Sequence, residues 1–243
     1  VIAIFGQAEM YGQPRQQTST YLLSTLNAGE SSMTVNGTIN WVVGDQIVVT
    51  PTSYDTNQEE TFTITGVSPA SPSGTVIQLN RAATYTHFGV SVDTSSTTNS
   101  NVPSSLMLAA SVGVLTRNVV ITSDLSTEAS YGGHVEVSEI MSKTSGSASP
   151  FVGSLVADHI EFRRMGQQSM EHPVLGFTYF PQTAGAAYNV DPTLKGNRIT
   201  GCAFTSNFNY AIKGTGAPNV VLNKNVIYQT YRSGIFWDEF STG

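Results

Sequence analysis

The residues best suited to acid–base chemistry are histidines and carboxylates in the second half of the chain. The candidates are His134, Asp158, His159, Glu161 and His172. A carboxylate pair beside a histidine can cleave a glycosidic bond or remove the C5 proton of a uronic acid. We therefore take His134, His159, Glu161 and His172 as weak catalytic candidates on one face of the predicted fold.

The local pattern argues against catalysis at most of these positions. In a strand through 158–162, side chains alternate, so His159 and Glu161 point together to the side opposite Asp158. We expect these two side chains to form an ordinary exposed pair. His172 precedes Pro173, and we interpret it as a loop residue rather than a ligand.

No motif indicates a metal or a cofactor. The chain has one cysteine and no His-Glu-x-x-His sequence. Asp124 and Glu128 lie in a Ser/Thr-rich segment that would bind Ca²⁺ only weakly. The glycines of 214–216 precede no helix and no Walker lysine, which favours a turn over a phosphate loop. Cys202 lies inside an apolar segment and is predicted to be a buried, unreactive thiol.

One N-glycosylation sequon is present, at Asn36-Gly-Thr38. If the protein is secreted, Asn36 is the position at which an N-glycan would be attached. The sequence leaves its occupancy open.

The composition narrows the function classes. The 243 residues are 40% hydrophobic and only 12% charged, with a net charge of −6. Low charge combined with many Thr, Val and Ile residues is typical of β-rich, often extracellular proteins. A negative chain without a Lys/Arg stripe repels phosphate backbones, so nucleic-acid binding is not expected. No run approaches the roughly 18 apolar residues that a membrane span needs.

Two similar segments near the C-terminus predict the architecture. They begin at Asn197 and Asn219, which lie 22 residues apart, and a second apolar strand follows each of them. A looser copy occupies 158–162. A period in this range with short alternating strands is typical of a solenoid, here a parallel β-helix. We expect Asn197, Asn219 and Asn225 to form a structural ladder of hydrogen bonds along the stack.

Other regions follow different patterns. Short, irregularly spaced strands between residues 19 and 93 predict a small antiparallel barrel or sandwich inserted between solenoid strands, with a tight hairpin at Asn36-Gly37. Strands at 106–110, 118–122 and 134–137 are assigned to the solenoid. Segments 94–105 and 138–149 are predicted surface loops. Segment 167–192 has little pattern but contains Tyr179, Phe180 and Tyr188, which are candidates for glycan contacts.

Six segments along the chain carry a specific combination of motifs. They are Phe5–Arg15, Trp41–Asp55 with Trp-x-x-Gly-Asp-x-Ile-x-Val, Gly113–Ile121 with Leu-Thr-Arg-Asn, Gly132–Glu136, Glu161–Gly166 and Tyr210–Gly214. In this order they resemble the region that follows the eight-glycine domain of fibrocystin-like proteins and of the cell-migration-inducing hyaluronidases. The resemblance implies a right-handed parallel β-helix in a secreted or cell-surface protein.

The same resemblance implies that this chain lacks the groups used by the depolymerising members. Those members carry two histidines separated by one residue after a proline, whereas here Val174–Phe177 follow Pro173. A His-Gly-Thr-His-Gly-like segment is replaced by Lys213–Ala217, and a Gly-His-Gly-like step by Arg232–Ile235. These differences weaken the hypothesis of an enzyme.

We therefore expect an all-β protein in three parts: leading solenoid strands in 1–15, an antiparallel subdomain in 16–103 and a parallel β-helix in 104–243. Because the chain begins in a strand-like run at Val1 and stops soon after Trp237, we expect a segment of a larger or processed protein. The leading hypothesis is a non-catalytic structural or interaction module of an extracellular surface or matrix protein. Its partners would be flanking domains or neighbouring copies at the solenoid ends, the copies stacking into a filament. A glycan-active enzyme on a hyaluronan-like polysaccharide and a non-catalytic glycan-binding module are the alternatives.

Overall fold

The chain folds as two compact units in which the regular structure is almost entirely β-strand. The computed structural model describes residues 1–93, 95, 105–124, 130–144, 147–179, 196–217 and 220–238. Within these residues a single 3-10 turn, Thr56–Gln58, is the one helical segment. Unit 1 comprises Val1–Pro14 and Arg117–Gly243, and unit 2 comprises Arg15–Thr116. The prediction of an all-β protein is confirmed.

The described residues of unit 1 form three sheets whose main ladders are parallel. Sheet 1 contains β1 (Ile2–Ile4), β12 (Val135–Thr144), β16 (Leu175–Thr178), β19 (Ile212–Thr215) and β22 (Ile235–Trp237). Sheet 2 contains β2 (Gln7–Tyr11), β14 (Ser154–Asp158), β17 (Asn197–Thr200) and β20 (Val220–Asn223). Sheet 3 contains β11 (Val119–Thr122), β15 (Ile160–Arg163), β18 (Ala203–Asn207) and β21 (Val226–Thr230).

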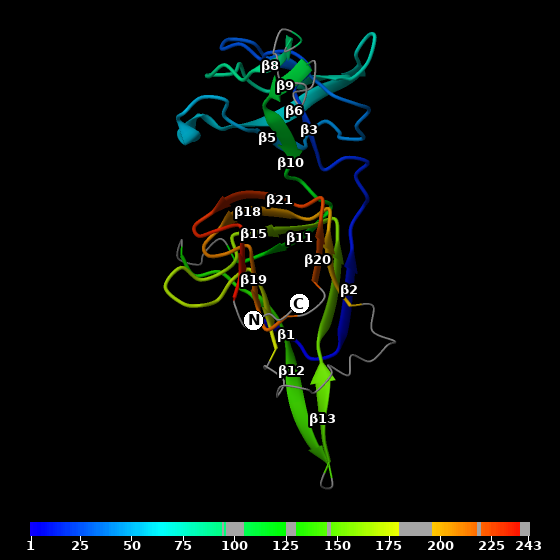
Figure 1. Ribbon diagram of the computed structural model, residues 1–243, viewed down its shortest axis with the longest axis vertical. Helices are drawn as coiled ribbons and strands as arrows, with labels where there is room; N and C mark the ends of the chain where they lie inside the picture. The colour runs from blue at the N-terminus through cyan, green and yellow to red at the C-terminus, as the bar shows by residue number, and fades with distance from the viewer. Residues whose placement is uncertain are drawn as a thin grey trace. The chain divides into compact units, whose positions relative to one another are not determined.

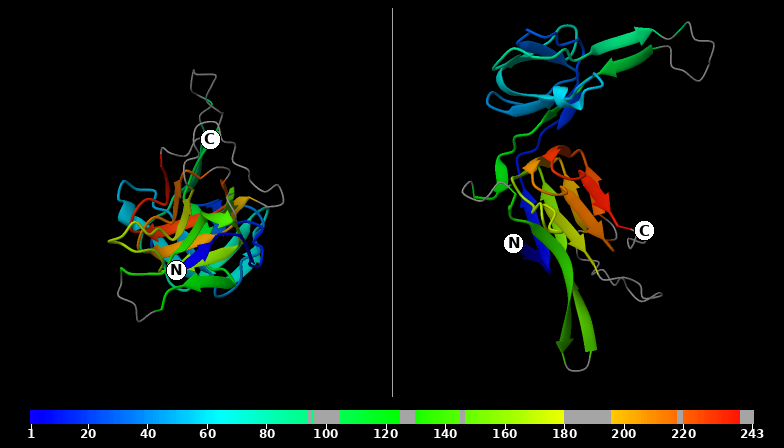
Figure 2. Two further views of the ribbon diagram at one scale, coloured as in Figure 1. Left: turned by 90° about the horizontal axis from the view of Figure 1, so that it is seen from below. Right: turned by 90° about the vertical axis from the view of Figure 1, so that its left-hand side faces the viewer.

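The chain visits these sheets in a fixed order. It passes from sheet 2 to sheet 3 to sheet 1 through β14, β15 and β16, and repeats the order through β17–β19 and β20–β22 (Figure 1). We call each such set of three strands, one from each sheet, a passage. Each strand pairs in parallel with its counterpart in the next passage, which stacks the passages on one another (Figure 2). The short strands and the Asn- and Gly-containing corners of the sequence repeat thus correspond to stacked passages.

The interior of unit 1 is a set of columns of apolar side chains. The strand register of sheet 3 aligns Ile121, Phe162, Phe204 and Ile227. Phe162 and Phe204 are fully buried, and their ring centroids lie 5.0 Å apart. Because strands of successive passages are adjacent in a sheet, each inward side chain packs on its equivalent one passage away.

Corners between sheets 2 and 3 use left-handed backbone at equivalent positions. His159, Gly201 and Lys224 have φ values of 55°, 63° and 53°. The amide of His159 donates to the carbonyl of Thr200 (2.9 Å), so the hydrogen bonding between passages continues through the bend.

Asparagine side chains complete the bonding at several corners. The Asn225 side chain accepts from the amide of Cys202 and donates to the carbonyl of Ile199, both at 2.9 Å. Asn197 accepts from the amide of Leu155 at 3.0 Å. Asn219, the remaining residue of the expected ladder, lies outside the described residues.

Two segments predicted to be loops contain strands. The predicted surface loop 138–149 is wrong, because β12 continues to Thr144 and pairs antiparallel with β13 (Ser147–Val152) in an arm that extends from sheet 1 (Figure 2). β16 lies inside the segment 167–192, where little pattern was expected. The arm is rich in Ser and is held by its own cross-strand pairing, and β16 is only four residues long and held by β12 and β19. Neither the arm nor β16 has a local periodicity that would have predicted it.

Unit 2 is built around one antiparallel sheet that is nearly closed. The strands follow the order β3 (Ser19–Tyr21), β10 (Ser111–Val114), β5 (Gln46–Val49), β6 (Glu60–Pro69), β7 (Thr75–Leu79) and β4 (Ser32–Val35). A bridge between Leu22 and Val35, and a 2.9 Å hydrogen bond from the amide of Asn36 to the carbonyl of Tyr21, join the two outer strands. The predicted small antiparallel subdomain is therefore a barrel-like sheet. The predicted hairpin at Asn36-Gly37 is wrong, because β4 pairs with β7 and with Leu22 instead.

A two-stranded antiparallel ribbon, β8 (Gly89–Asp93) with β9 (Ser105–Ala109), completes unit 2. The expectation that residues 106–110 form a solenoid strand is wrong. An apolar run such as Leu106–Leu108 predicts a strand, but the run by itself does not identify the partner.

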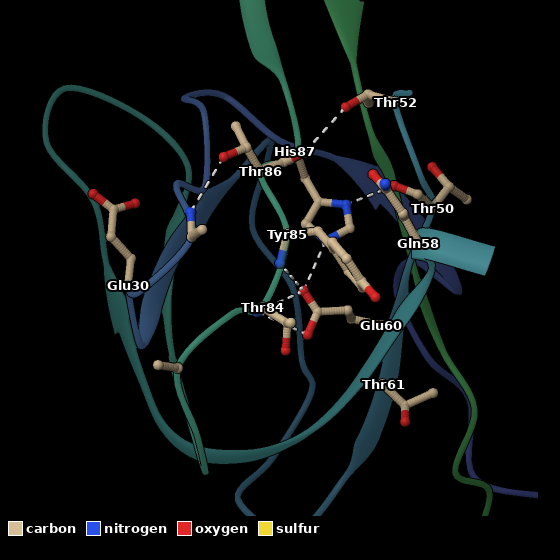
Figure 3. Close-up of polar contacts among 12 residues, drawn as sticks. Glu30, Thr50, Thr52, Gln58, Glu60, Thr61, Thr84, Tyr85, Thr86 and His87 are labelled. Atoms are coloured by element: carbon tan, nitrogen blue, oxygen red, sulfur yellow. Dashed lines mark hydrogen bonds and ion pairs between the residues drawn. The ribbon is translucent and has the colours of Figure 1, made fainter. Parts of the chain in front are cut away.

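A buried carboxylate fastens the chain that leads into β8. Glu60 accepts hydrogen bonds from the amides of Thr84 and Tyr85 at 2.9 Å, and it lies 3.2 Å from Nε2 of His87 (Figure 3). The guanidinium of Arg81 donates to the same carboxylate at 2.7 Å. Burial acts to raise the pKa of Glu60, but the hydrogen bonds from Tyr85, Thr84, Arg81 and His87 outweigh it and lower the pKa to about 2. Glu60 is therefore an ionised anchor for this segment of unit 2.

Candidate functional site

Two of the histidines singled out by the sequence lie against each other. The rings of His134, which precedes β12, and His172, which precedes β16, are 4.3 Å apart and nearly parallel. His134 is only 7% exposed, and its Nδ1 has no hydrogen-bond partner among the described residues. Burial and then the proximity of His172 lower the pKa of His134, which favours the neutral form of its imidazole.

The turn that carries His172 is fastened from the next passage. The side-chain amide of Asn209 donates to the carbonyls of Gln167 and Met170, at 2.6 and 2.7 Å. A bridge between Gln167 and His172 closes the turn. This part of the predicted loop is therefore an ordered platform that presents Glu171 and His172 beside sheet 1.

The outward side chains of sheet 1 form a column next to this platform. The register aligns Ala3, Glu136, Gly176, Lys213 and Phe236 across five strands. A Cβ atom at Gly176 would lie 2.0 Å from a carboxylate oxygen of Glu136, so the glycine provides the space that Glu136 occupies. Burial raises the pKa of Glu136, although Thr178, His172 and Lys213 oppose that shift.

Charged and aromatic groups lie close together at the end of the column that β19 and β22 form. Nζ of Lys213 lies 2.7 Å from one carboxylate oxygen of Glu171, and Arg232 lies 3.5 Å from the other. The Arg232 guanidinium also lies over the ring of Tyr210, 5.3 Å from its centroid. The rings of Tyr210 and Phe236 stack with their centroids 5.1 Å apart.

We call this surface the sheet 1 face. Its residues are His134, Glu136, Glu171, His172, Gly176, Tyr210, Lys213, Arg232 and Phe236. It combines stacked aromatic rings, two cations and two carboxylates on a firm sheet. Such a surface can cover an apolar ring face while hydrogen bonding to polar groups at the ring's edge.

The other two catalytic candidates lie elsewhere and are buried. His159 is 9% exposed and Glu161 is 5% exposed, so the expected exposed pair is wrong. The left-handed bend at His159 separates β14 from β15, and strand alternation does not continue across it. The His159 ring packs over Gly201 and bonds to Asp158. Glu161 accepts hydrogen bonds from the backbone amide of Arg117 and from the hydroxyl of Thr205. These contacts link the corners of unit 1.

The remaining sequence candidates are not part of the sheet 1 face. Cys202 is fully buried, and burial raises the pKa of its thiol to about 11. Tyr179 is 2% exposed and donates to the carbonyl of Gly153, so it is not available for an external glycan. Phe180, Tyr188 and Glu128 lie outside the described residues. Asn36 is partly exposed in unit 2.

Among the residues that the structure describes, no group of three or more His, Cys, Asp or Glu side chains is arranged to hold a metal ion. None of the helical segments in that part of the chain has the length and apolarity to cross a membrane.

Sequence reasoning missed several residues of the sheet 1 face. Glu136, Tyr210, Lys213, Arg232 and Phe236 come from three passages and have no shared local motif. The signal that could have found them is the register: aligning the third strand of each passage places Glu136, Lys213 and Phe236 in one column.

The comparisons with known proteins extend over nearly the whole chain. No family model matches it. It is 28% identical to mouse fibrocystin-L over 97% of this chain and 5% of that protein, and 27% identical to a G8 domain-containing protein of Dictyostelium discoideum over 93% of this chain and 17% of that protein. Among solved structures, the tailspike protein gp49 of Pseudomonas phage LKA1 matches 90% of this chain and 30% of its own, with 10% identity and a TM-score of 0.29. The similarity to fibrocystin-like proteins is thus confirmed, and the chain spans a small part of these relatives.

Proposed function

We propose that this chain is a non-catalytic structural and interaction module of an extracellular surface or matrix protein, and that it holds a polysaccharide on the sheet 1 face. The observation that carries the proposal is the stacked pair Tyr210 and Phe236 with Lys213 and Arg232 beside it. The C–H face of a sugar ring packs on aromatic rings, and its hydroxyls bond to charged side chains.

The proposed scaffold is a right-handed parallel β-helix. Support comes from the repeated order of sheets 2, 3 and 1 and from the strong preference of parallel crossovers for the right hand. In such a scaffold the outward column of sheet 1 follows the stacking direction. A linear polysaccharide lying along that direction would contact several passages at once.

An extracellular location is supported by the similarity to fibrocystin-L and to G8 domain-containing proteins. The relatives are much longer than this chain, which supports flanking domains as partners of unit 1.

Stacking of separate copies into a filament is the other arrangement that we propose. Sedimentation of the isolated chain over a wide concentration range tests it. N-glycosylation of Asn36 belongs to the same proposal, and mass spectrometry of the secreted protein tests it.

Replacing Tyr210 or Phe236 by alanine is expected to weaken polysaccharide binding by about 5- to 10-fold, the loss that follows from removing one aromatic contact. Affinity electrophoresis on a panel of neutral and acidic extracellular polysaccharides measures it. The matched control is Tyr11→Ala, which removes an exposed tyrosine from sheet 2. Tyr11→Ala should bind at wild-type strength, and the same result for both Tyr210→Ala and Phe236→Ala would contradict the proposal.

The alternative function is a glycan-active enzyme, and one observation favours it. Glu136 has a raised pKa and lies near His172, an arrangement that suits a general acid and a base. Depolymerisation of a hyaluronan-like polysaccharide would proceed at this pair.

We expect no depolymerisation, because His134 is buried against His172 and the histidines of the depolymerising proteins are absent from the sequence. Size analysis of hyaluronan-like chains after incubation, with and without divalent ions, checks this. The panel of variants is Glu136→Gln and the alanine variants of His134, His159 and His172. Chain shortening by the wild type that Glu136→Gln abolishes would establish the enzyme instead.

A further inference from the structure

Glu171 forms salt bridges with two cations of the sheet 1 face. Lys213 and Arg232 approach the two different oxygens of one carboxylate, at 2.7 and 3.5 Å. The carboxylate itself is 68% exposed, whereas the side chain of Lys213 is 19% exposed. The anion is therefore the outermost member of the cluster, and the cations lie beneath or beside it.

Both cations are held by contacts other than Glu171. Lys213 lies 5.9 Å from the ring centroid of Phe236, and Arg232 lies over Tyr210 and bonds to its hydroxyl at 3.3 Å. Glu136, aligned two strands from Lys213, is the other carboxylate of the face. Removing the Glu171 carboxylate would leave the cations in place on their aromatic supports.

An exposed ion pair contributes little free energy, since water screens it and long side chains lose freedom in forming it. An external carboxylate that arrives already positioned by a bound sugar can therefore replace Glu171 at small cost. Two cations arranged for the two oxygens of a carboxylate also suit a planar anion.

We propose that Glu171 is an internal stand-in for the anionic group of an acidic sugar, and that Lys213 and Arg232 form the subsite that recognises it. This inference rests on the proposed function, since it names the class of polysaccharide held on the sheet 1 face. The shared chemistry is an anion on a sugar ring, either the carboxylate of a uronic acid or a sulfate ester. Because the stand-in is a carboxylate, the uronic acid is the ligand that we favour.

The test compares the wild type with Glu171→Gln, using a glucuronate-containing oligosaccharide, a sulfated one and a neutral one of equal length. Glu171→Gln is expected to raise the affinity for the glucuronate oligosaccharide, relative to that for the neutral one, about 5- to 10-fold. Lys213→Gln and Arg232→Gln, each combined with Glu171→Gln, are expected to remove the gain. Glu59→Gln, a charge-matched change in unit 2, is expected to have no effect. Circular dichroism melting confirms that each variant folds.

The outcomes separate this inference from the function on which it rests. Affinity for the glucuronate oligosaccharide that is unchanged or lower in Glu171→Gln overturns the inference, while Tyr210-dependent binding of the neutral oligosaccharide still supports the proposed function. If no oligosaccharide binds, free glucuronate and inorganic sulfate are titrated by NMR. Binding of glucuronate to Glu171→Gln alone would retain the anion subsite without the polysaccharide function. Tighter binding of the sulfated oligosaccharide only would assign the subsite to sulfate and overturn the preference for uronic acid.

Discussion

Replacing Phe204 by alanine is expected to lower the free energy of unfolding of unit 1 by about 4 kcal/mol. Phe204 is fully buried, and it packs on Phe162 of the preceding passage with ring centroids 5.0 Å apart. Its register partner on the other side is Ile227. Truncation removes a large apolar group from the middle of a column, and the paired strands on both sides limit collapse around the cavity.

Pulsed hydrogen exchange with mass spectrometry across a urea series measures this effect, because peptides from the two units are observed separately. The matched control is Phe5→Ala, which makes the same change at a side chain that is 41% exposed and should cost less than about 1 kcal/mol. Phe204→Leu should recover most of the loss. Equal costs at Phe204 and Phe5 would show that the column does not carry the stability of unit 1.

Replacing Glu60 by glutamine is expected to destabilise unit 2 by about 3 kcal/mol near pH 7, because it removes the charge of a buried, hydrogen-bonded ion. Glu60 is 4% exposed, and His87, one of its partners, is fully buried. Glutamine has the same shape but presents an N–H₂ group where the carboxylate accepts. The amides of Thr84 and Tyr85 and the cation of Arg81 would compete for one remaining acceptor.

The effect has a defined pH dependence. The pKa of Glu60 is lowered from 4.5 to about 2 in the folded unit, so ionisation contributes stability above about pH 4.5. That contribution is lost as the pH falls towards 2. The difference in unfolding free energy between wild type and Glu60→Gln should therefore be largest near neutral pH and shrink across this window.

The two tryptophans make the measurement simple. Trp41 is buried in the barrel-like sheet of unit 2, and Trp237 lies in unit 1. In a Trp237→Phe background, urea unfolding followed by fluorescence reports unit 2 alone. Glu59→Gln is the neighbouring control. A Glu60→Gln protein whose stability falls in parallel with the wild type between pH 4.5 and 2 would refute the assigned role.

Local patterns in the sequence predicted the strand class and much of the core. Alternation identified segments such as Glu161-Phe162 and Ala203-Phe204, because the side chains of a strand point to opposite faces whatever its partner. Alternation failed at His159, where a left-handed residue interrupts the strand, and in the Ser-rich arm of β12 and β13, where cross-strand pairing supplies the order. The histidine candidates were chosen by residue type, which carries no information about which of them lie close together in the fold. Of these histidines, His134 and His172 are neighbours, whereas His159 lies elsewhere.

The sequence by itself determined that this protein is all-β, that Cys202 is set in an apolar segment and that apolar columns can form, since each of these depends on residues close together in the chain. Only the tertiary structure decided which polar residues share a surface. Glu136, Lys213 and Phe236 are far apart in sequence. Glu171 and Arg232 lie outside the strands, in the segments that precede β16 and β22. They meet because parallel pairing fixes the register of successive passages, and that register depends on long-range hydrogen bonds rather than on any local pattern.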